Sequence, residues 1–306
     1  MHLSSRHLAA IAVLTAIAAP LSAQSVVGRS ETAFTASERL PDQGWVRIGS
    51  PNGPIRVVAG QGSSVEIRAE KRVNRGSEED VGFVVRRSRD GITVCAVYES
   101  ADECGDEGSY SGRDLPRNWW DRHQVSVAFT ISVPRGARIK VGTGNGAVAV
   151  EGVGGEVIAN TGNGRVDVTG TSGSVKAATG NGRVLIDGTE GPVDVNTGNG
   201  DVEVTSVLGE VSAHTGNGSI EVAIGRADPP ADLDLTTGSG SITIVAPDDF
   251  GAQIRTSTGN GRIRTDFDIE TRDRLERGRI RGTIGDGRGR IHATSGNGNV
   301  TIRRKP

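Results

Sequence analysis

Two cysteines are the residues of this sequence whose types and spacing point most directly to a definite chemistry. Cys95 and Cys104 are separated by eight residues, and the chain has no other cysteine. In an exported chain, such a pair predicts a structural disulfide. A metal site is the competing interpretation, but the neighbouring Asp102, Glu103 and Asp106 are hard oxygen donors that do not match soft thiolates. We therefore expect a disulfide that ties a loop, with no metal site and no cofactor.

Histidines, serines and acids do not form a pattern typical of an active site. Two of the five histidines fall in the leader segment described below, which leaves His123, His214 and His292. His214 stands before a turn, at a position that other repeats fill with Asn or Ala, and this favours a structural role. No recurrent set of Ser, His and Asp accompanies these residues, as a hydrolase triad would require. We expect no catalytic residues and a protein that is not an enzyme.

A cluster of arginines is the one irregular feature within the repeats described below. It lies in residues 266–282, an insertion into the longest repeat unit. Arginine binds carboxylate and phosphate groups through paired hydrogen bonds, and irregular excursions on a regular scaffold often carry function. The cluster is therefore a candidate surface for an anionic glycan or a protein partner, and a charged hairpin leaning on the repeats is the alternative. Its members are Arg272, Arg274, Arg277, Arg279 and Arg281.

The first 23 residues predict a secretory signal peptide. A polar start containing Arg6 precedes an apolar run over residues 8–19, and small residues suited to cleavage follow. The run is shorter than the about 20 residues that a membrane-spanning helix needs, and no later segment comes close. We expect no membrane span, and a location in the periplasm, at the cell surface or outside the cell.

The charge of the chain argues against nucleic acid as a partner. Removal of residues 1–23 takes away one arginine and no acid, which leaves 34 basic residues against 37 acidic ones. Proteins that bind nucleic acid usually present a basic surface. We expect no nucleic-acid partner.

An internal repeat sets the elements that must position these side chains. The quartet Thr-Gly-Asn-Gly recurs at a spacing of 18 residues, and variants of it follow at wider spacing. A fixed period of this kind is the signature of a repeat architecture. The eight quartets begin at Thr143, Thr161, Thr179, Thr197, Thr215, Thr237, Thr258 and Ser295.

Each 18-residue unit contains two short segments in which apolar and polar residues alternate. The segments 166–168 (Val-Asp-Val) and 175–177 (Val-Lys-Ala) form one such pair. A period of two predicts a strand with one dry face and one wet face, so two strands per unit predict two sheets.

The recurrence of the quartet favours a parallel β-solenoid over an antiparallel meander. Asn-Gly is also a hairpin signal, so a meander is a genuine alternative. In a meander, however, nothing requires the same four residues at every second turn. In a solenoid, equivalent residues stack about 4.8 Å apart and Asn side chains can form a hydrogen-bonded ladder, while Gly and Asn also tolerate the positive φ of tight turns. The expected turn ladder is Asn145, Asn163, Asn181, Asn199, Asn217, Asn260 and Asn297.

The composition of the repeats supports a narrow interior and argues against two specialised functions. Residues 131–248 contain no Phe, Tyr or Trp, although sheets ordinarily favour aromatic residues. The aspartate at position 167 has no counterpart in most units, so a column of calcium ligands is absent. Only one threonine per unit recurs, which does not provide the paired rows of an ice-binding face.

The chain is expected to divide into a signal peptide (1–23), an N-terminal β region with the Cys95/Cys104 loop (24–135) and a solenoid (136–306). Residues 24–135 also alternate in places, but they lack the 18-residue period and hold most of the aromatic residues. They are expected to cap one end of about eight rungs. The charged residues 303–306 are expected to close the other end, because charge protects exposed strand edges.

These features together carry a family resemblance. With its leader, its irregular β opening that ends in residues 131–134 (Ile-Ser-Val-Pro), and its repeats of the form Thr-Gly-Asn-Gly-x-Val-x-Val, the chain resembles the bacterial putative-adhesin family of unknown function with β-strand repeats. The resemblance covers roughly residues 40–304. It implies the architecture and supplies no catalytic or binding residues.

The sequence therefore predicts an exported, all-β, non-enzymatic scaffold that binds an envelope or extracellular component, either glycan or protein. Two alternatives remain: a polysaccharide-acting enzyme on the side of the solenoid, and a self-assembling structural protein.

Overall fold

The computed structural model describes residues 26–98, 103–105, 110–111, 124–226, 230–271 and 278–305. The predicted signal peptide lies outside these residues. Most of residues 99–123, the loop that contains Cys104, lies outside them too. Within the described residues, no helix is long and apolar enough to cross a membrane.

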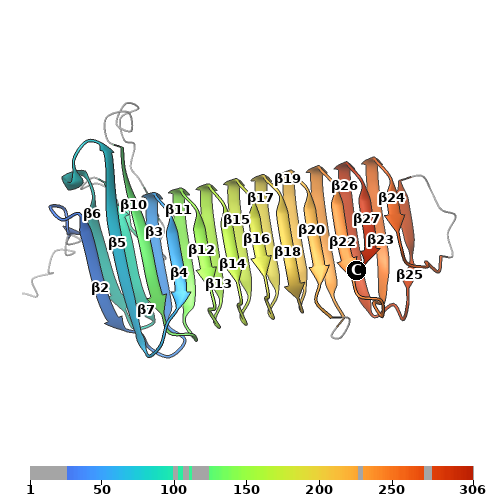
Figure 1. Ribbon diagram of the computed structural model, residues 1–306, viewed down its shortest axis with the longest axis horizontal. Helices are drawn as coiled ribbons and strands as arrows, with labels where there is room; N and C mark the ends of the chain where they lie inside the picture. The colour runs from blue at the N-terminus through green and yellow to red at the C-terminus, as the bar shows by residue number, and fades with distance from the viewer. Residues whose placement is uncertain are drawn as a thin grey trace, which may run out of the picture.

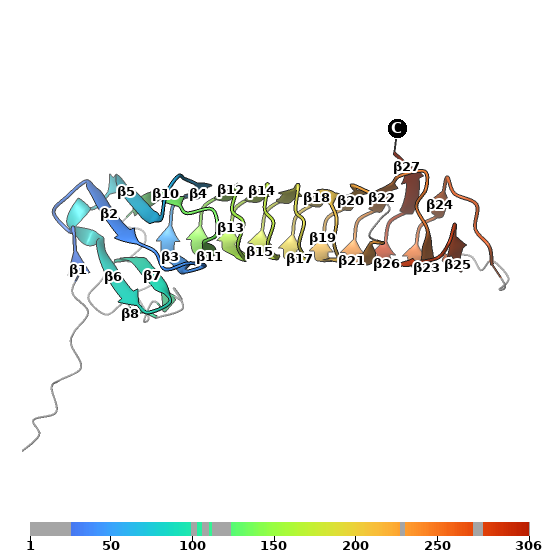
Figure 2. The same ribbon diagram turned by 90° about the horizontal axis from the view of Figure 1, so that it is seen from below.

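Two long sheets lie face to face and run the length of a rod (Figures 1 and 2). Among the described residues the first sheet has 13 strands and the second has 12. In spatial order, the first sheet consists of β1 (Val26–Val27), β6 (Gly82–Ser88), β7 (Gly91–Val97), β3 (Trp45–Asn52), β11 (Arg138–Asn145), β13 (Val157–Asn163), β15 (Val175–Asn181), β17 (Val193–Asn199), β19 (Val211–Asn217), β21 (Asp232–Ser239), β26 (Gly289–Asn297), β23 (Ala252–Asn260) and β25 (Arg279–Ile284).

The second sheet lies opposite and supplies the other strand of each lap. In spatial order it consists of β2 (Ala33–Arg39), β5 (Ser64–Arg75), β10 (Gln124–Val133), β4 (Ile55–Ala59), β12 (Val148–Glu151), β14 (Val166–Thr169), β16 (Val184–Asp187), β18 (Val202–Val207), β20 (Ile220–Ile224), β22 (Ile242–Ala246), β27 (Val300–Arg304) and β24 (Ile263–Thr265). A small ribbon of β8 (Glu103–Cys104) and β9 (Tyr110–Ser111) and a 3₁₀ turn, η1 (Glu78–Asp80), complete the elements.

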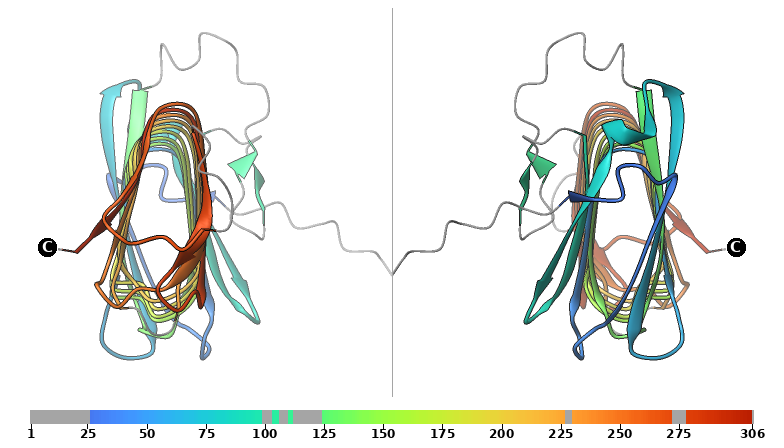
Figure 3. Two further views of the ribbon diagram at one scale, coloured as in Figure 1. Left: turned by 90° about the vertical axis from the view of Figure 1, so that its right-hand side faces the viewer. Right: turned by 90° about the vertical axis from the view of Figure 1, so that its left-hand side faces the viewer.

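Successive 18-residue units pair in parallel and in register, which confirms the predicted β-solenoid. Thr143 of β11 lies opposite Thr161 of β13, and Thr161 lies opposite Thr179 of β15. In the second sheet, Val166 of β14 lies opposite Val148 and Val184 in the same manner. Viewed along the rod, the laps superimpose as one flattened ring (Figure 3).

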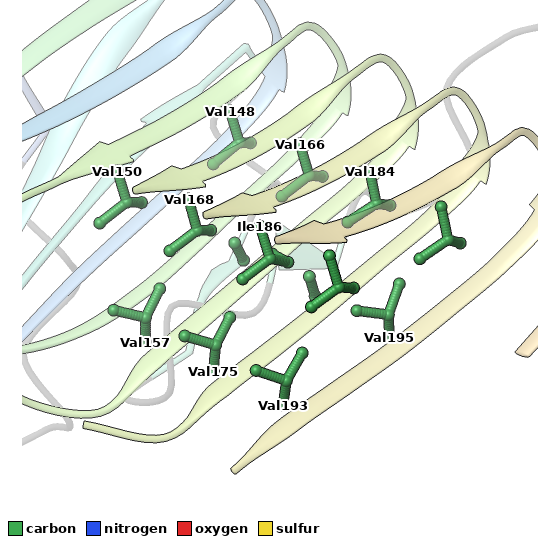
Figure 4. Close-up of a cluster of buried hydrophobic side chains, with 14 of the residues drawn as sticks. Val148, Val150, Val157, Val166, Val168, Val175, Val184, Ile186, Val193 and Val195 are labelled. Atoms are coloured by element: carbon green, nitrogen blue, oxygen red, sulfur yellow. The ribbon is translucent and has the colours of Figure 1, made fainter. Parts of the chain in front are cut away.

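Aliphatic side chains from both sheets fill the space inside each lap. Val148, Val166 and Val184 stack along one sheet, and Val157, Val175 and Val193 stack along the other (Figure 4). All six are fully or almost fully buried. A single unit could not bury its own apolar side chains, so the burial of each lap depends on the laps on either side.

Residues before 136 close one end of the rod with antiparallel strands and a wider, aromatic core. β5 pairs antiparallel with both β2 and β10, and β6 pairs antiparallel with β7. Phe83 stacks on Phe34 with ring centroids 4.7 Å apart and meets Phe129 edge-on at 6.0 Å. The buried Tyr98 donates its hydroxyl to the Val125 carbonyl oxygen at 2.9 Å.

One solenoid lap lies earlier in the chain than the periodicity indicates. β3 and β4 pair in parallel with β11 and β12, and Asn52 occupies the register position of Asn145. The segment 50–53 (Ser-Pro-Asn-Gly) is therefore a degenerate quartet. The division between an N-terminal β region and a solenoid at residue 135 remains a prediction. This first solenoid lap lies on the N-terminal side of that boundary.

The last laps do not stack in chain order. β26 and β27 lie between β21/β22 and β23/β24, so the final repeat in the sequence occupies the penultimate level of the rod. The expectation that residues 303–306 close the end is therefore wrong for Arg303 and Arg304, which belong to the interior strand β27. The outermost strands at this end are β25 in the first sheet and β24 in the second.

Candidate functional site

The predicted disulfide is present. Cys95 of β7 and Cys104 of β8 are bonded, with their Cα atoms 5.7 Å apart. Both are fully buried in a small apolar cluster with Val84 and Val97, separate from the main core. Cys95 lies opposite Gly49 of β3, so the bond attaches the β8/β9 ribbon to the outer face of the first sheet. Its position is structural, at the capped end of the rod.

The asparagines of the quartets form a row of side-chain hydrogen bonds along one edge of the rod. In each bond the Nδ2 group of one asparagine donates to Oδ1 of the asparagine on the neighbouring lap, at 2.8–2.9 Å. One run links Asn52, Asn145, Asn163, Asn181, Asn199 and Asn217, and a separate bond joins Asn260 to Asn297. Ser239 occupies the level between the two parts. Because the amides bond to one another, the asparagine side chains along this edge stabilise the stacking of the laps.

The glycines of the quartets are required mainly by the neighbouring lap. A Cβ on Gly162 would lie 2.5 Å from the Gly144 carbonyl oxygen, and one on Gly164 would lie 2.0 Å from the Gly146 carbonyl oxygen. Among the described residues, the only non-glycine residues with positive φ are Gln43 and Ser206. The expectation that the asparagines adopt positive φ is therefore wrong, and their recurrence comes from the ladder.

A groove of about 1160 Å³ lies on the outer face of the first sheet, near the end formed by the last laps. It extends over β21, β26, β23 and β25, which lie side by side in Figure 2. Residues 269–271, from the insertion, contribute to its wall. Eight of its lining residues are ionisable: Glu210, Asp232, Asp234, Glu270, Arg255, Arg281, Arg290 and His292.

Register places four of these side chains in one row across four strands. Asp234 of β21 lies opposite His292 of β26, which lies opposite Arg255 of β23, which lies opposite Arg281 of β25. All four are exposed or half-buried on the wet face of the sheet. The charge therefore changes from acidic to basic along the row.

One acid of the groove, Asp232, is neutralised by an arginine within the groove. Arg290 bonds to Asp232 through two of its nitrogens, one of them Nε at 3.1 Å from Oδ2. This hydrogen bonding holds the pKa of Asp232 below its ordinary value, because it stabilises the carboxylate. His292 Nδ1 lies 3.4 Å from Asp234 Oδ1.

The basic side is not neutralised. Arg255 and Arg281 have no ion pair or side-chain hydrogen bond with any part of the chain that the structure describes. Opposed pairs on antiparallel strands alternate between hydrogen-bonded and non-hydrogen-bonded. The Thr258 amide donates to the Gly278 carbonyl oxygen, so that pair is hydrogen-bonded. The pair Arg255/Arg281 lies three positions away and is therefore non-hydrogen-bonded. In such a pair the Cα atoms are only about 4.5 Å apart, so two guanidinium groups start from closely opposed backbone positions.

Of the predicted partner surface, Arg279 and Arg281 lie on β25 and Arg281 lines the groove. Arg272, Arg274 and Arg277 lie outside the described residues. The sequence did not indicate Arg255, which joins the site through the pairing of β23 with β25. Nor did it indicate Asp232 and Arg290, which are neighbours only because β26 lies between β21 and β23. Of the histidines, His214 bonds to Ser212 at 3.1 Å, away from the groove, and His123 is not among the described residues.

Nothing in this arrangement resembles a metal centre. Across the described ranges, no group of three or more His, Cys, Asp and Glu side chains is placed to hold a metal ion.

Comparison with known proteins gives a family match and several remote solved structures. No curated protein matches the chain. One solved structure is a putative cell adhesion protein from Clostridium sporogenes ATCC 15579, at 11% identity and a TM-score of 0.21, with 89% of this chain and 100% of that chain covered. Another is a putative adhesin from Bacteroides fragilis NCTC 9343, at 12% identity and a TM-score of 0.41, with 90% and 99% covered.

The family match rests on the repeats. The model of the family described as Toastrack DUF4097 matches residues 117–303, which is more than half of the chain. That range includes every Thr-Gly-Asn-Gly quartet and its variants. The resemblance derived from the quartets is thereby confirmed, and the chain belongs to the Toastrack DUF4097 family.

Proposed function

We propose that this protein is exported and acts, without catalysing a reaction, as a rigid scaffold that binds an envelope or extracellular component through the groove on its first sheet. The observation that carries this proposal is the opposed pair Arg255 and Arg281, which face solvent in a groove and form no ion pair among the described residues. Unneutralised like charges at a cross-strand position destabilise a sheet, and a bound partner removes that cost.

The disulfide supports export. A bond between Cys95 and Cys104 persists in oxidising compartments and is rare where thiols are kept reduced. This agrees with the signal peptide that the first 23 residues predict.

One carboxylate of the groove is unsuited to the acid role in a polysaccharide-acting enzyme. A glycosidase needs a carboxylic acid whose pKa is raised, so that it can protonate the leaving group. The Asp232 carboxylate in the groove has the opposite property, because Arg290 lowers its pKa.

The proposal is tested by location and binding together. The full-length chain is expressed in a bacterial host, and cell fractions are treated with a maleimide before and after reduction. We expect the protein in the periplasm or outside the cell, with both cysteines blocked until they are reduced. The purified protein should then sediment with isolated envelope or extracellular material and release no new reducing ends from polysaccharides.

Two results would contradict the proposal. Free thiols in a cytosolic pool would contradict export. Turnover of a polysaccharide that is lost on Asp232→Asn or Glu270→Gln would make the enzyme the better interpretation. Asp187→Asn, which changes an exposed carboxylate on the second sheet, is the matched control.

A further inference from the structure

We infer that the groove binds a glycan carrying isolated carboxylate groups, of the uronic-acid class, with the carboxylate held by Arg255 and Arg281. This inference rests on the proposed function and assigns a ligand class to its site. It begins from the two guanidinium groups and is narrowed by the side chains around them.

The register makes the two arginines suitable for a single small anion. They are direct neighbours on antiparallel strands, at a non-hydrogen-bonded position where side chains approach most closely. Guanidinium groups bind carboxylates through two parallel hydrogen bonds, so two of them can hold both oxygens of one carboxylate.

The remaining polar lining selects for hydroxyl groups near that carboxylate. Gln253 and Thr283 are direct neighbours in the same strand pair, two positions from Arg255 and Arg281. Both line the groove, and both can donate and accept hydrogen bonds with sugar hydroxyls.

The acidic lining disfavours ligands of high charge density. Glu210, Asp234 and Glu270 also line the groove, so a polymer with a charge on every unit and sulfate groups besides would meet repulsion. A chain rich in hydroxyls, with one carboxylate at the arginines, meets complementary groups at both places. The same reasoning disfavours an acidic peptide with adjacent carboxylates.

The test is calorimetric titration of the purified protein with oligomers of neutral sugars that each carry a single galacturonic, glucuronic or mannuronic acid residue. Parallel titrations use the methyl ester of the galacturonic oligomer and heparin. The variants are Arg255→Gln, Arg281→Gln and the double variant. Arg264→Gln is the matched control, because Arg264 is an exposed arginine on the outer face of the second sheet at the same end of the rod.

We expect at least one of the three acidic oligomers to bind. Each arginine variant should weaken binding about tenfold or more, since hydrogen bonds to charged groups contribute about 1.5–3 kcal/mol. Arg264→Gln should leave the affinity unchanged, and the methyl ester should not bind. Each single variant should also melt at or above the temperature of the parent, because it removes one of two like charges.

Three results would overturn the inference: no binding of any acidic oligomer, equal affinity of the double variant and the parent, or tighter binding of heparin than of the uronic acids. If the oligomers fail while the parent still sediments with envelope material, the ligand class is wrong and the proposed function stands. If the parent binds no envelope or extracellular material either, the proposed function fails as well.

Discussion

The first residue of each quartet is buried, and its hydroxyl explains why it recurs. Thr161 donates to the carbonyl oxygen of Gly146 on the neighbouring lap, and Ser295 makes the same bond to Gly240. Equivalent bonds are made by Thr143, Thr179, Thr197, Thr215, Thr237 and Thr258. Most of these carbonyl groups belong to half-buried residues, where a hydrogen bond contributes about 0.5–1.5 kcal/mol, and this favours Thr and Ser at the position over Val.

Substitution of one such threonine tests this role. Thr179→Val keeps the shape but leaves the Gly164 carbonyl oxygen, now bonded at 3.0 Å, without the hydroxyl. We expect a loss of about 0.5–1.5 kcal/mol in the free energy of unfolding, measured by urea denaturation. Thr243→Val, on the half-buried outer face of β22, is the control and should have little effect. Equal effects of the two changes would show that the buried bond contributes nothing particular.

A second residue-scale prediction concerns acid stability at the capped end. Arg47 and Ser88 donate hydrogen bonds to Asp90 and lower the pKa of its carboxyl group from 3.8 to about 2. The folded state therefore binds the proton less tightly than the unfolded state. The resulting stabilisation is complete above pH 3.8 and is lost as the pH falls toward 2.

We expect Asp90→Asn to lower the melting temperature at pH 6, and this difference from the parent to shrink as the pH falls from 4 to 2. Because the Asp90 side chain is about half exposed, the effect should not exceed about 1 kcal/mol. Asp42→Asn, an exposed carboxylate with no ion pair among the described residues, is the control. A difference that does not change with pH would contradict the assignment.

At the scale of the element, the lap is a pair of strands whose turns must pass close to the lap before. The alternation of apolar and polar residues was enough to predict both strands of each unit, because burial on one face of a strand leaves a direct trace in the sequence. The function of the glycines was harder to predict. Their recurrence indicates a tight turn, and several of them do have positive φ, but the structure also shows that the backbone of the neighbouring lap occupies the space where a side chain would be.

Two glycine substitutions separate these effects. In Gly162→Ala the backbone has no positive φ, and the new Cβ would lie 2.5 Å from the Gly144 carbonyl oxygen, so the laps must move apart. We expect a loss of about 3 kcal/mol or more in the free energy of unfolding. Gly142→Ala is the control, because a Cβ there meets no atom within 4 Å. Similar stabilities of the two variants, measured by chemical denaturation, would contradict close lap-to-lap approach.

The candidate site could be predicted only in part, because strand pairing brings together residues that are far apart in the sequence. The arginines of the insertion were identified by composition, and Arg279 and Arg281 indeed lie on a strand of the first sheet. Arg255, which is the neighbour of Arg281, lies 26 positions earlier in the chain. Its place in the sequence pattern is that of an ordinary solvent-facing strand residue. Only the pairing of β23 with β25 shows that Arg255 and Arg281 are opposed.

At the scale of the whole molecule, both ends of the rod depart from chain order. Near one end, β3/β4 lies between β7/β10 and β11/β12, and near the other, β26/β27 lies between β21/β22 and β23/β24. Periodicity reports that laps stack but carries no information about which lap is next to which, so these exchanges could not be predicted. The second exchange brings Asp232, Arg290 and Arg255 together and so builds the groove.

The most direct test of this account is the order of the last laps. Thr236 of β21 and Thr294 of β26 are register neighbours, as are Thr294 and Ser257 of β23. Neighbouring strands are about 4.8 Å apart, within the range for a disulfide, whereas strands one level further apart are about 9–10 Å distant and cannot be bridged. Oxidation of the double variant Thr236→Cys/Thr294→Cys should therefore yield a new disulfide by peptide mass mapping, and Thr236→Cys/Ser257→Cys should yield none. A disulfide in the second variant and none in the first would show that the laps stack in chain order, which would contradict the inserted lap and the groove that depends on it.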